Sequence, residues 1–305
     1  MTHTVRALIA YGVERFDKSG LSYGHGTTNA LDEAAWLILY SLGLPLDELN
    51  PHLDEPLTNA QWRAAKTLLD LRARSRKPAA YLTHEAWLGK HKFYVDERVI
   101  VPRSFIAELL RNWGQTPDFE RESAPAAGEN RGLSPVSVPA SVLDLCTGSG
   151  CLAILAALAW PRAKVDAADL SADALAVARR NVADYMLVRR VRLVKSDLFS
   201  ALPARKYDLI ISNPPYVKAS SMRKLPDEYR KEPEMALASG TDGLEHTRRI
   251  LAQAKEHLNS GGLLAVEIGH NRAALEKAYP KLPFEWPRVA AGIGYVFTIA
   301  REKLP

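Results

Sequence analysis

The sequence lacks the features of a membrane protein, a secreted protein or a disulfide scaffold. Across its 305 residues no apolar run approaches the length of about eighteen residues that a membrane-spanning helix requires. The N-terminal residues lead into a stretch with Glu14, Arg15, Asp17 and Lys18, so the continuous apolar core of a signal peptide is missing. We therefore expect a cytoplasmic, globular protein, in line with a hydrophobic content of 47% and a charged content of 25%.

Cysteine is scarce, and the net charge is small. The two cysteines, Cys146 and Cys151, do not have the spacing of a CxxC redox motif, and two thiols alone cannot complete a metal site. We expect both to be reduced and the protein to bind no metal. The net charge of +5 is compatible with an acidic or RNA-containing partner, but it does not by itself indicate one.

The first 80 residues carry the pattern of helices. Apolar side chains recur at helical spacing over 31–42, Gly43-Leu44-Pro45 ends that segment, and Thr58 is placed to cap the next. The basic run 72–77 is interpreted as a solvated helix end, with a partner-binding patch as the alternative. We predict a small helical domain over 1–80 and expect it to dock the substrate.

A β-rich connector is predicted over 81–101. Its aromatic and β-branched residues suggest short strands at 86–88, 92–95 and 98–101, paired as hairpins. Residues 116–140 are rich in Pro, Ala, Ser and Gly and show no apolar periodicity. We expect them to form a flexible insertion within a catalytic domain over 102–305.

Strand and helix patterns alternate after this insertion. Strands are predicted at 141–145, 163–169, 191–194, 207–212 and 262–268, and helices at 151–160, 172–185 and 247–258. The alternation predicts an α/β fold with a doubly wound, Rossmann-like parallel sheet. Functional residues should then lie at the carboxyl ends of the strands, where the order of the strands reverses.

A glycine-containing turn follows the first of these strands. It runs from Asp144 to Gly150, and its glycines would let the backbone approach a ligand closely. The spacing is not that of the dinucleotide GxGxxG motif, and no Lys-Ser/Thr pair of a phosphate loop is present. A short turn that starts with an acid suits a zwitterionic or cationic ligand, although a simple packing turn is the alternative.

Acidic residues end the next two strands. Asp169 could accept hydrogen bonds from both ribose hydroxyls of an adenosine, and Asp197 could bind the adenine amino group. Each acid taken alone would more often be a turn or cap residue. Their occurrence at successive strand ends favours a nucleoside site.

The tetrad Asn213-Pro214-Pro215-Tyr216 ends the fourth strand. The Asn213 side-chain oxygen and the Pro214 carbonyl could each accept one hydrogen from a planar NH₂ group. Holding both hydrogens would direct the nitrogen lone pair at a methyl donor and stabilise the positive charge that develops. The prolines fix the backbone, and the Tyr216 ring could pack against the planar group.

Together these segments resemble the protein-(glutamine-N5) methyltransferase family of class I S-adenosylmethionine-dependent methyltransferases. The resemblance extends over nearly the whole chain and includes Val101-Pro102-Arg103-Ser104 and the segment that starts at Glu232. It implies S-adenosyl-L-methionine as cofactor, S-adenosyl-L-homocysteine as product and no metal. It also implies a glutamine side-chain amide as the methyl acceptor.

Within the family, the sequence around Val101-Pro102-Arg103 resembles the branch that methylates large-subunit ribosomal protein three. The C-terminal 292–297 lacks the Gly-Arg-Asp-Arg ending of the release-factor branch, whereas Phe105 departs from the proline expected in the ribosomal branch. Leu198 stands where release-factor enzymes have an aromatic residue. Peptide chain release factors therefore remain the alternative substrate.

The resemblance implies roles for individual residues. The cofactor is expected to contact Asp144, Cys146, Thr147, Gly148, Ser149, Gly150, Asp169, Asp197, Leu198 and Asn213. The substrate glutamine is expected to contact Asn213, Pro214, Pro215 and Tyr216, with Val101, Pro102, Arg103 and Glu232 framing the pocket. For Arg103 a structural ion pair is favoured over a catalytic role, because amide methylation needs no cation beside a sulfonium.

Two other functions would use similar features. A DNA adenine N6-methyltransferase must hold a comparable amino group, but it needs base flipping and a target-recognition region, and the extra domain here is helical and weakly basic. A non-catalytic RNA-binding or ribosome-assembly module would not need an intact cofactor turn and tetrad. We therefore expect a protein partner and neither DNA nor membrane.

Overall fold

The computed structural model describes residues 3–115 and 138–305, which fall into two compact units. Unit 1 comprises Met1–Glu97, Val101–Arg103 and Leu225–Glu232, and unit 2 comprises Arg98–Ile100, Ser104–Lys224 and Pro233–Pro305. Of the predicted insertion at 116–140, only 138–140 belong to the described residues.

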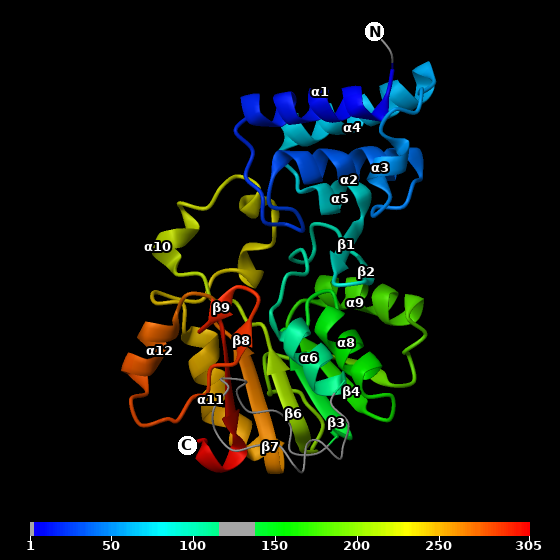
Figure 1. The fold of residues 1–305 in the computed structure, drawn as a ribbon. Helices are drawn as coiled ribbons and strands as arrows, with labels where there is room; N and C mark the ends of the chain where they lie inside the picture. Colours follow the sequence, from blue (N-terminus) through cyan, green and yellow to red (C-terminus); the bar gives the residue numbers. More distant parts are fainter. Residues whose placement is uncertain (1–2, 116–137) are drawn as a thin grey trace. The chain divides into compact units, whose positions relative to one another are not determined.

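Unit 1 is mainly helical, as its sequence predicts (Figure 1). Its helices are α1 Val5–Lys18, α2 Ala30–Leu42, α3 Leu49–His52, α4 Asn59–Ser75, α5 Ala79–Thr83 and the 3-10 turn η1 Tyr229–Lys231. Asn29 caps α2 by accepting the Asp32 N–H at 2.9 Å, and Thr58 forms a capping box with Gln61 at the start of α4. Gly43 ends α2 with a left-handed φ of 69°.

Two predictions for residues 72–101 are wrong. Strands β1 Glu85–Leu88 and β2 His91–Tyr94 form the expected antiparallel hairpin, but 98–101 is not a strand. Arg72 is fully buried instead of solvated, and its Nε lies 2.6 Å from Glu33 Oε1. The buried acid that pairs with Arg72 lies on α2, so the local charge pattern alone could not predict its burial.

Unit 2 is built on a six-stranded sheet in the order β10-β7-β6-β3-β4-β5. Its strands are β3 Ser141–Leu145, β4 Lys164–Asp169, β5 Val191–Lys195, β6 Tyr207–Ser212, β7 Leu258–Glu267 and β10 Val296–Ala300. The first five are parallel and match the predicted strands, which confirms the doubly wound α/β class. β10 was not predicted, and it runs antiparallel to β7.

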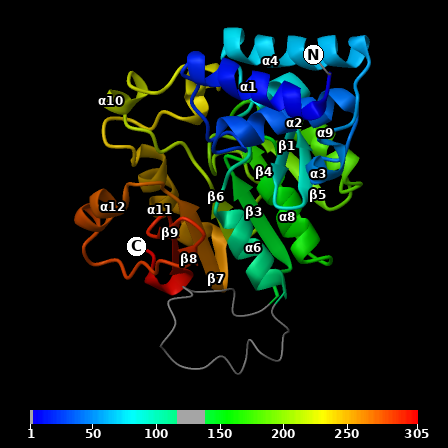
Figure 2. The ribbon, with the colours of Figure 1, turned by 45° about the horizontal axis from the view of Figure 1, so that its top comes forward.

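The helices of unit 2 cover both faces of this sheet (Figures 1 and 2). They are α6 Ile106–Gln115, α8 Cys151–Ala159, α9 Ala172–Asp184, α10 Ala219–Met222, α11 Glu245–His257 and α12 Arg272–Ala278, with 3-10 turns η2 Glu234–Ala236 and η3 Arg301–Lys303. A short hairpin pairs β8 Arg288–Val289 with β9 Gly292–Ile293. From β3 to β5 successive strands are added toward one edge of the sheet, and from β6 onward they are added toward the other edge. Because parallel crossovers are right-handed, this change places α8 and α9 on one face of the sheet and α11 on the other.

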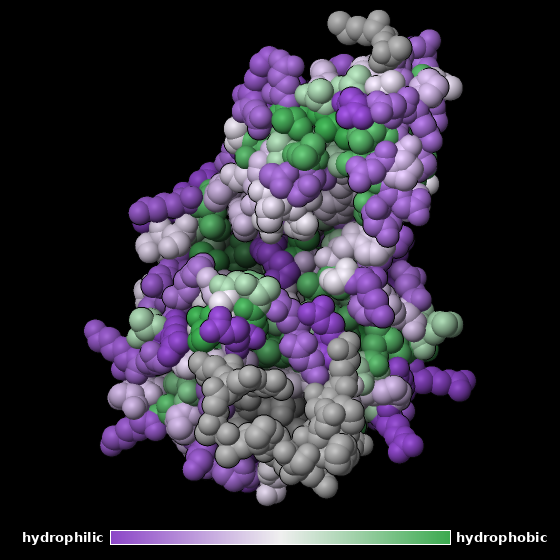
Figure 3. Space-filling view, in the orientation of Figure 1, coloured by the Kyte–Doolittle hydropathy of each residue, from purple (hydrophilic) through white to green (hydrophobic). Residues whose placement is uncertain are grey.

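The strand order reverses between β3 and β6. Leu145, the last residue of β3, pairs with Ser212, the last residue of β6. The turn that starts at Cys146 and the tetrad that starts at Asn213 therefore leave the sheet side by side. The apolar side chains beneath them are buried, whereas Figure 3 shows many hydrophilic side chains on the visible face, with hydrophobic patches between them.

Candidate active site

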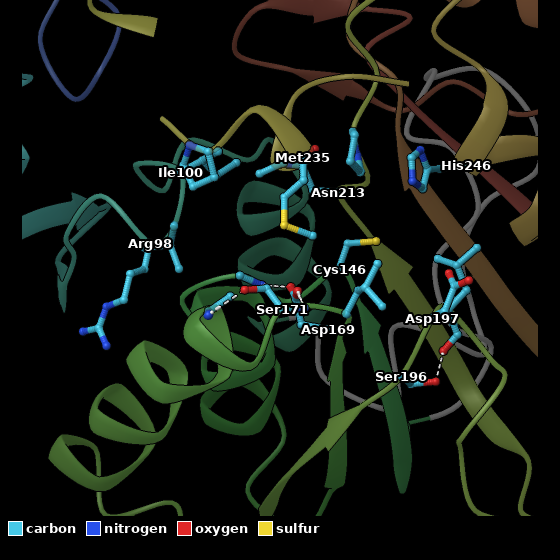
Figure 4. Close-up of a pocket in the computed structure, with 18 residues that line it drawn as sticks. Arg98, Ile100, Cys146, Asp169, Ser171, Ser196, Asp197, Asn213, Met235 and His246 are labelled. Atoms are coloured by element: carbon cyan, nitrogen blue, oxygen red, sulfur yellow. Dashed lines mark hydrogen bonds between the residues drawn. The ribbon is translucent and has the colours of Figure 1, made fainter. Parts of the chain in front are cut away.

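A cavity with about 710 Å³ of empty space opens at the carboxyl ends of β3, β4, β5 and β6, and all its lining residues belong to unit 2. It is lined by Arg98, Val99, Ile100, Cys146, Gly148, Asp169, Leu170, Ser171, Ala174, Ser196, Asp197, Leu198, Asn213, Pro215, Pro233, Met235, Ala236 and His246. In Figure 4, Cys146 lies between Asn213 on one side and Asp169 on the other. The structure therefore brings seven predicted site residues together: Cys146, Gly148, Asp169, Asp197, Leu198, Asn213 and Pro215.

The glycine turn presents Gly148 to the cavity. Gly148 has a φ of +56°, and a Cβ at this position would meet no atom within 4 Å, so the backbone is open to a ligand. Gly150 does not line the cavity; a Cβ there would lie 3.1 Å from Ala178 Cβ on α9. The two predicted glycines thus differ in position: Gly148 faces the cavity, and Gly150 allows the turn to pack on α9.

The rest of the turn is held from below by Asp144, which lies outside the cavity lining. Asp144 Oδ2 accepts the Thr147 hydroxyl at 2.6 Å and the Ala153 N–H at 3.0 Å. Ser149 also lies outside the lining, and its carbonyl accepts Asn181 Nδ2 at 2.9 Å. Burial raises the pKa of Asp144 to about 7.

Asp169 faces the cavity from the end of β4. Its Oδ2 accepts the Gly148 N–H at 2.8 Å, and its Oδ1 accepts the Ser171 N–H at 2.9 Å (Figure 4). Burial nonetheless raises the pKa of this carboxyl above its usual range. Because each carboxylate oxygen has two lone pairs, Asp169 can still accept hydrogen bonds from a ligand.

Asp197 lies at the partly exposed end of β5. Arg249 Nη2 lies 2.8 Å from Asp197 Oδ2, and this hydrogen bond lowers the pKa of the carboxyl. The next residue, Leu198, is buried and lines the cavity. Leu170, the residue after the end of β4, also lines the cavity, with 52% of its surface exposed.

The tetrad ends β6 with an unpartnered acceptor. Asn213 Oδ1 is buried, and no group of the described residues donates a hydrogen bond to it. Pro215 lines the cavity, whereas Pro214 and Tyr216 do not. The Tyr216 carbonyl accepts Asn271 Nδ2 at 2.8 Å, and the Tyr216 ring packs closely on Gly269. The tetrad is thus anchored at its end and leaves a free acceptor at its start.

The predicted framing residues form a buried ionic cluster in unit 1. Glu232 Oε1 accepts the Val101 N–H at 2.9 Å, and the Arg103 guanidinium makes a bidentate pair with both Glu232 oxygens at 2.5 and 2.6 Å. His25 Nε2 lies 3.6 Å from Glu232 Oε2. Burial opposes ionisation, but the charge and hydrogen bonds of Arg103, together with the nearby His25, hold the pKa of Glu232 down at about 2. The ion pair favoured for Arg103 is confirmed.

None of the four framing residues lines the cavity itself. Val101 and Pro102 are buried and follow the lining residue Ile100, and Glu232 directly precedes the lining residue Pro233. Glu232 therefore ties together the two segments whose neighbours in sequence line the cavity. In the described part of the chain, no group of His, Cys, Asp and Glu could hold a metal ion.

Known proteins are similar to this chain both in one domain and over almost its full length. Residues 133–232 match the family model of the methyltransferase small domain. The ribosomal protein uL3 glutamine methyltransferase of Neisseria meningitidis serogroup A is 52% identical over 99% of this chain and 94% of the relative. The enzyme of that name from Burkholderia pseudomallei is 52% identical over 99% of this chain and 96% of the relative.

This chain belongs to the ribosomal protein uL3 glutamine methyltransferase family. It is an enzyme of the methyltransferase class, and the resemblance seen in its sequence is confirmed. A ribosomal protein L11 methylase from Lactobacillus delbrueckii subsp. bulgaricus is among the solved structures that this chain matches, with 21% identity, a TM-score of 0.40, and coverage of 71% of this chain and 88% of that chain. No helix among the described residues of this family member has the length and apolarity needed to cross a membrane.

The sequence analysis missed one polar residue of the cavity in this uL3 methyltransferase family member. His246 projects from the first turn of α11, and its Nδ1 lies 2.9 Å from Ser239 Oγ. Burial lowers the pKa of the imidazole, which favours its neutral form. Met235, which is 50% exposed, and Arg98, whose guanidinium points away from the other labelled residues in Figure 4, were also missed. No local sequence signal marks His246, because it reaches the cavity only through the crossover after β6 that places α11 there.

Proposed function

We propose that this enzyme transfers a methyl group from S-adenosyl-L-methionine to the side-chain amide nitrogen of one glutamine in ribosomal protein uL3. The curated relatives carry that activity in their names and match almost the full chain. The observation in the structure that supports it is at Asn213, a residue that lines the cavity and whose buried Oδ1 lacks a donor among the described residues. A buried acceptor without a partner is costly, and a substrate NH₂ group would supply the missing donor.

The cavity fits the cofactor. The methionine part would lie against the open Gly148 backbone, the ribose hydroxyls would donate to Asp169, and the adenine would lie between Leu170 and Leu198 near Asp197. The bound cofactor supplies a methyl group already activated by a sulfonium, so no metal and no covalent enzyme intermediate are needed. Cys146 would only pack against it, because burial raises the pKa of its thiol and keeps the sulfur neutral.

The tetrad would orient the amide. Asn213 Oδ1 and the Pro214 carbonyl accept the two amide hydrogens, which aims the nitrogen at the methyl group and stabilises the positive charge that builds up there. The two prolines hold the carbonyl in place. The nitrogen becomes acidic as it is methylated and loses its proton late, so the chain need not provide a base before the transfer.

The choice of uL3 over release factors rests on the relatives. The helical residues 1–80 are proposed as the docking region for the protein substrate, and the reaction is placed in the cytoplasm, where ribosomal proteins are made. DNA is the least favoured acceptor, because the described residues supply a helical extra domain and no evident target-recognition region.

Initial rates of methyl transfer to purified uL3, a peptide chain release factor and adenine-containing DNA test this proposal. With equal concentrations of acceptor and saturating S-adenosyl-L-methionine, kcat/KM should be at least about a hundredfold higher for uL3, the size of discrimination that a few specific contacts can give. A higher value for the release factor would move the enzyme to the other branch. Transfer to DNA alone would overturn the protein-glutamine assignment.

A further inference from the structure

The positive charge of this chain is concentrated in one segment. Residues 179–195 contain five Arg and one Lys against one acid, Asp184, so this short segment carries +5, which equals the net charge of the whole chain. The segment spans the end of α9, the loop 185–190 and the edge strand β5. The net charge of the whole chain is small, but it is concentrated in this one segment and not spread over the sequence.

The fold arranges these cations along the edge of the sheet. Lys164 Nζ donates to the Arg189 carbonyl at 3.1 Å, which brings the start of β4 beside the loop. In the parallel β4–β5 backbone register, Arg192 lies opposite Asp166, and Lys195 lies opposite Asp169. The residue after Lys195, Ser196, lines the cavity. The row of cations thus runs from the amino ends of the strands to the rim of the active site.

Several of these cations have no acidic partner. Arg190 is used internally, since it donates to the Ala157 carbonyl at 2.6 Å, and Arg192 neutralises Asp166. In contrast, Arg162, Arg179, Arg189 and Lys195 are exposed, and among residues 3–115 and 138–305 no acid forms an ion pair with them. We call these four residues together with Lys164 the cationic edge.

Exposed apolar side chains lie within the same loop. Met186 is 88% exposed and Val188 is 65% exposed, the two highest values among the large hydrophobic residues that the structure describes. Met186 also has a left-handed φ of 55°, so the loop holds this side chain outward in a conformation that few residues adopt. Exposed apolar groups amid unpaired cations are typical of a binding surface.

We propose that the cationic edge binds the phosphate backbone of RNA, so that the enzyme meets its ribosomal protein substrate with RNA attached. Phosphates are favoured over an acidic protein because Arg dominates the segment, and its planar, weakly hydrated guanidinium suits phosphate recognition. A row along the edge strand also fits a polymer better than a compact anion. The identity of the protein substrate rests on the proposed function, whereas the binding of RNA does not.

The test compares two charge-matched triple variants by fluorescence anisotropy with a labelled single-stranded RNA of mixed sequence. One variant is Arg162→Gln/Arg179→Gln/Arg189→Gln in the cationic edge. The control is Lys277→Gln/Lys281→Gln/Arg288→Gln, which removes the same charge from exposed positions on α12 and in the segment that leads from it to β10, the opposite edge strand. Thermal unfolding of both variants checks that these exposed substitutions leave the fold intact.

In the cationic-edge variant, Kd for the RNA should rise at least about tenfold, and the slope of log K against log salt should become shallower by about two to three. In the control variant, Kd for the RNA should stay within about twofold of that of the unmodified enzyme, because losing the same net charge at a distant surface has only a screened effect. Methyl transfer to free uL3 should be unchanged in both variants. An unchanged Kd in the cationic-edge variant would overturn the proposal.

A polyglutamate competitor separates RNA from an acidic protein. Polyglutamate of matched charge should displace the RNA poorly, since carboxylates do not reproduce the spacing of phosphates. Displacement as effective as that by unlabelled RNA would overturn the assignment to RNA in favour of an acidic polypeptide. Binding is measured without cofactor or protein substrate, so failure here is distinct from failure of the methyl-transfer assay.

Discussion

Two buried polar groups of this enzyme are treated in opposite ways. Asn213 Oδ1, at the cavity of unit 2, is buried without a donor. Glu232, in unit 1, is buried with the Val101 N–H, the Arg103 guanidinium and His25 around it. Leaving a buried acceptor unpaired costs about 1–3 kcal/mol, and at Asn213 a donor from the substrate would offset that cost. Full pairing instead indicates a structural role, which explains why Glu232 lies outside the cavity lining.

The largest effect is expected at Asn213. Asn213→Ala removes the acceptor that orients the amide, and kcat should fall by at least about a thousandfold, the scale of losing a preorganised group that stabilises developing charge. The free energy of unfolding should change little, because no described residue donates a hydrogen bond to Oδ1. The Kd of the cofactor should also change little, because the proposed role of this oxygen is to bind the substrate amide. Single-turnover rates with calorimetric cofactor binding measure both quantities.

Asn213→Asp is the matched control for that variant. It keeps an acceptor oxygen at the same reach, so its rate should lie well above that of Asn213→Ala. Equal rates for the two variants would show that the acceptor does not orient the substrate, and the contrast with Glu232 would fail.

Glu232→Ala should act on stability first. It leaves the Arg103 guanidinium and the Val101 N–H without their acceptor and removes the carboxylate beside the buried His25, which should lower the free energy of unfolding by about 3–5 kcal/mol. Urea unfolding measures the loss. Glu234→Ala, an exposed position two residues on, should stay within about 0.5 kcal/mol of the unmodified enzyme. If both variants lost the same stability, the ionic cluster would not hold unit 1 together.

Asp144 and Glu232 should also make contributions to stability that depend on pH with opposite sign. In the folded protein the pKa of Asp144 is raised from 3.8 to about 7, so Asp144 ionises at a lower pH in the unfolded chain than in the folded protein. The free energy of unfolding should therefore fall by up to roughly 4 kcal/mol as pH rises from about 4 to 7. The pKa of Glu232 is lowered from 4.5 to about 2, so the stability that it contributes is present above pH 4.5 and is lost as pH falls toward 2. Unfolding curves of Asp144→Asn and the unmodified enzyme across pH 4–7 isolate the first contribution. A constant difference between them would contradict the raised pKa.

The smallest expected effect concerns the cofactor. Asp169→Ala should raise the Kd of S-adenosyl-L-methionine by at least about tenfold, because hydrogen bonds to a charged group contribute about 1.5–3 kcal/mol. Asp173→Ala removes an exposed acid from the first turn of α9 and should leave Kd unchanged. Equal effects would mean that general charge, and not the position of Asp169, governs binding.

The sequence predicts those parts of the structure that depend on local patterns. The five parallel strands, the cap at Thr58 and the end of α2 at Gly43 follow from apolar periodicity and capping residues. The gathering of Gly148, Asp169, Asp197 and Asn213 follows because parallel strands end at one edge of the sheet.

The remaining features depend on contacts between residues distant in sequence. Arg72 is buried because Glu33 on α2 pairs with it, and His246 reaches the cavity only through the crossover between β6 and β7. Strand β10 could not be predicted from an alternation of strands and helices, because it pairs antiparallel with β7 and needs no crossover helix. The unpartnered state of Asn213 Oδ1 likewise emerges only once its surroundings are in place.

The most direct test of the central claim is the position of the methyl group on uL3 after reaction with the enzyme and S-adenosyl-L-methionine. Tandem mass spectrometry should place one added methyl on a single glutamine side chain, and acid hydrolysis of that peptide should release methylamine. Reaction with Asn213→Ala should leave the same glutamine unmodified. A methyl group on lysine, arginine or the backbone, or an unchanged yield with Asn213→Ala, would contradict the account.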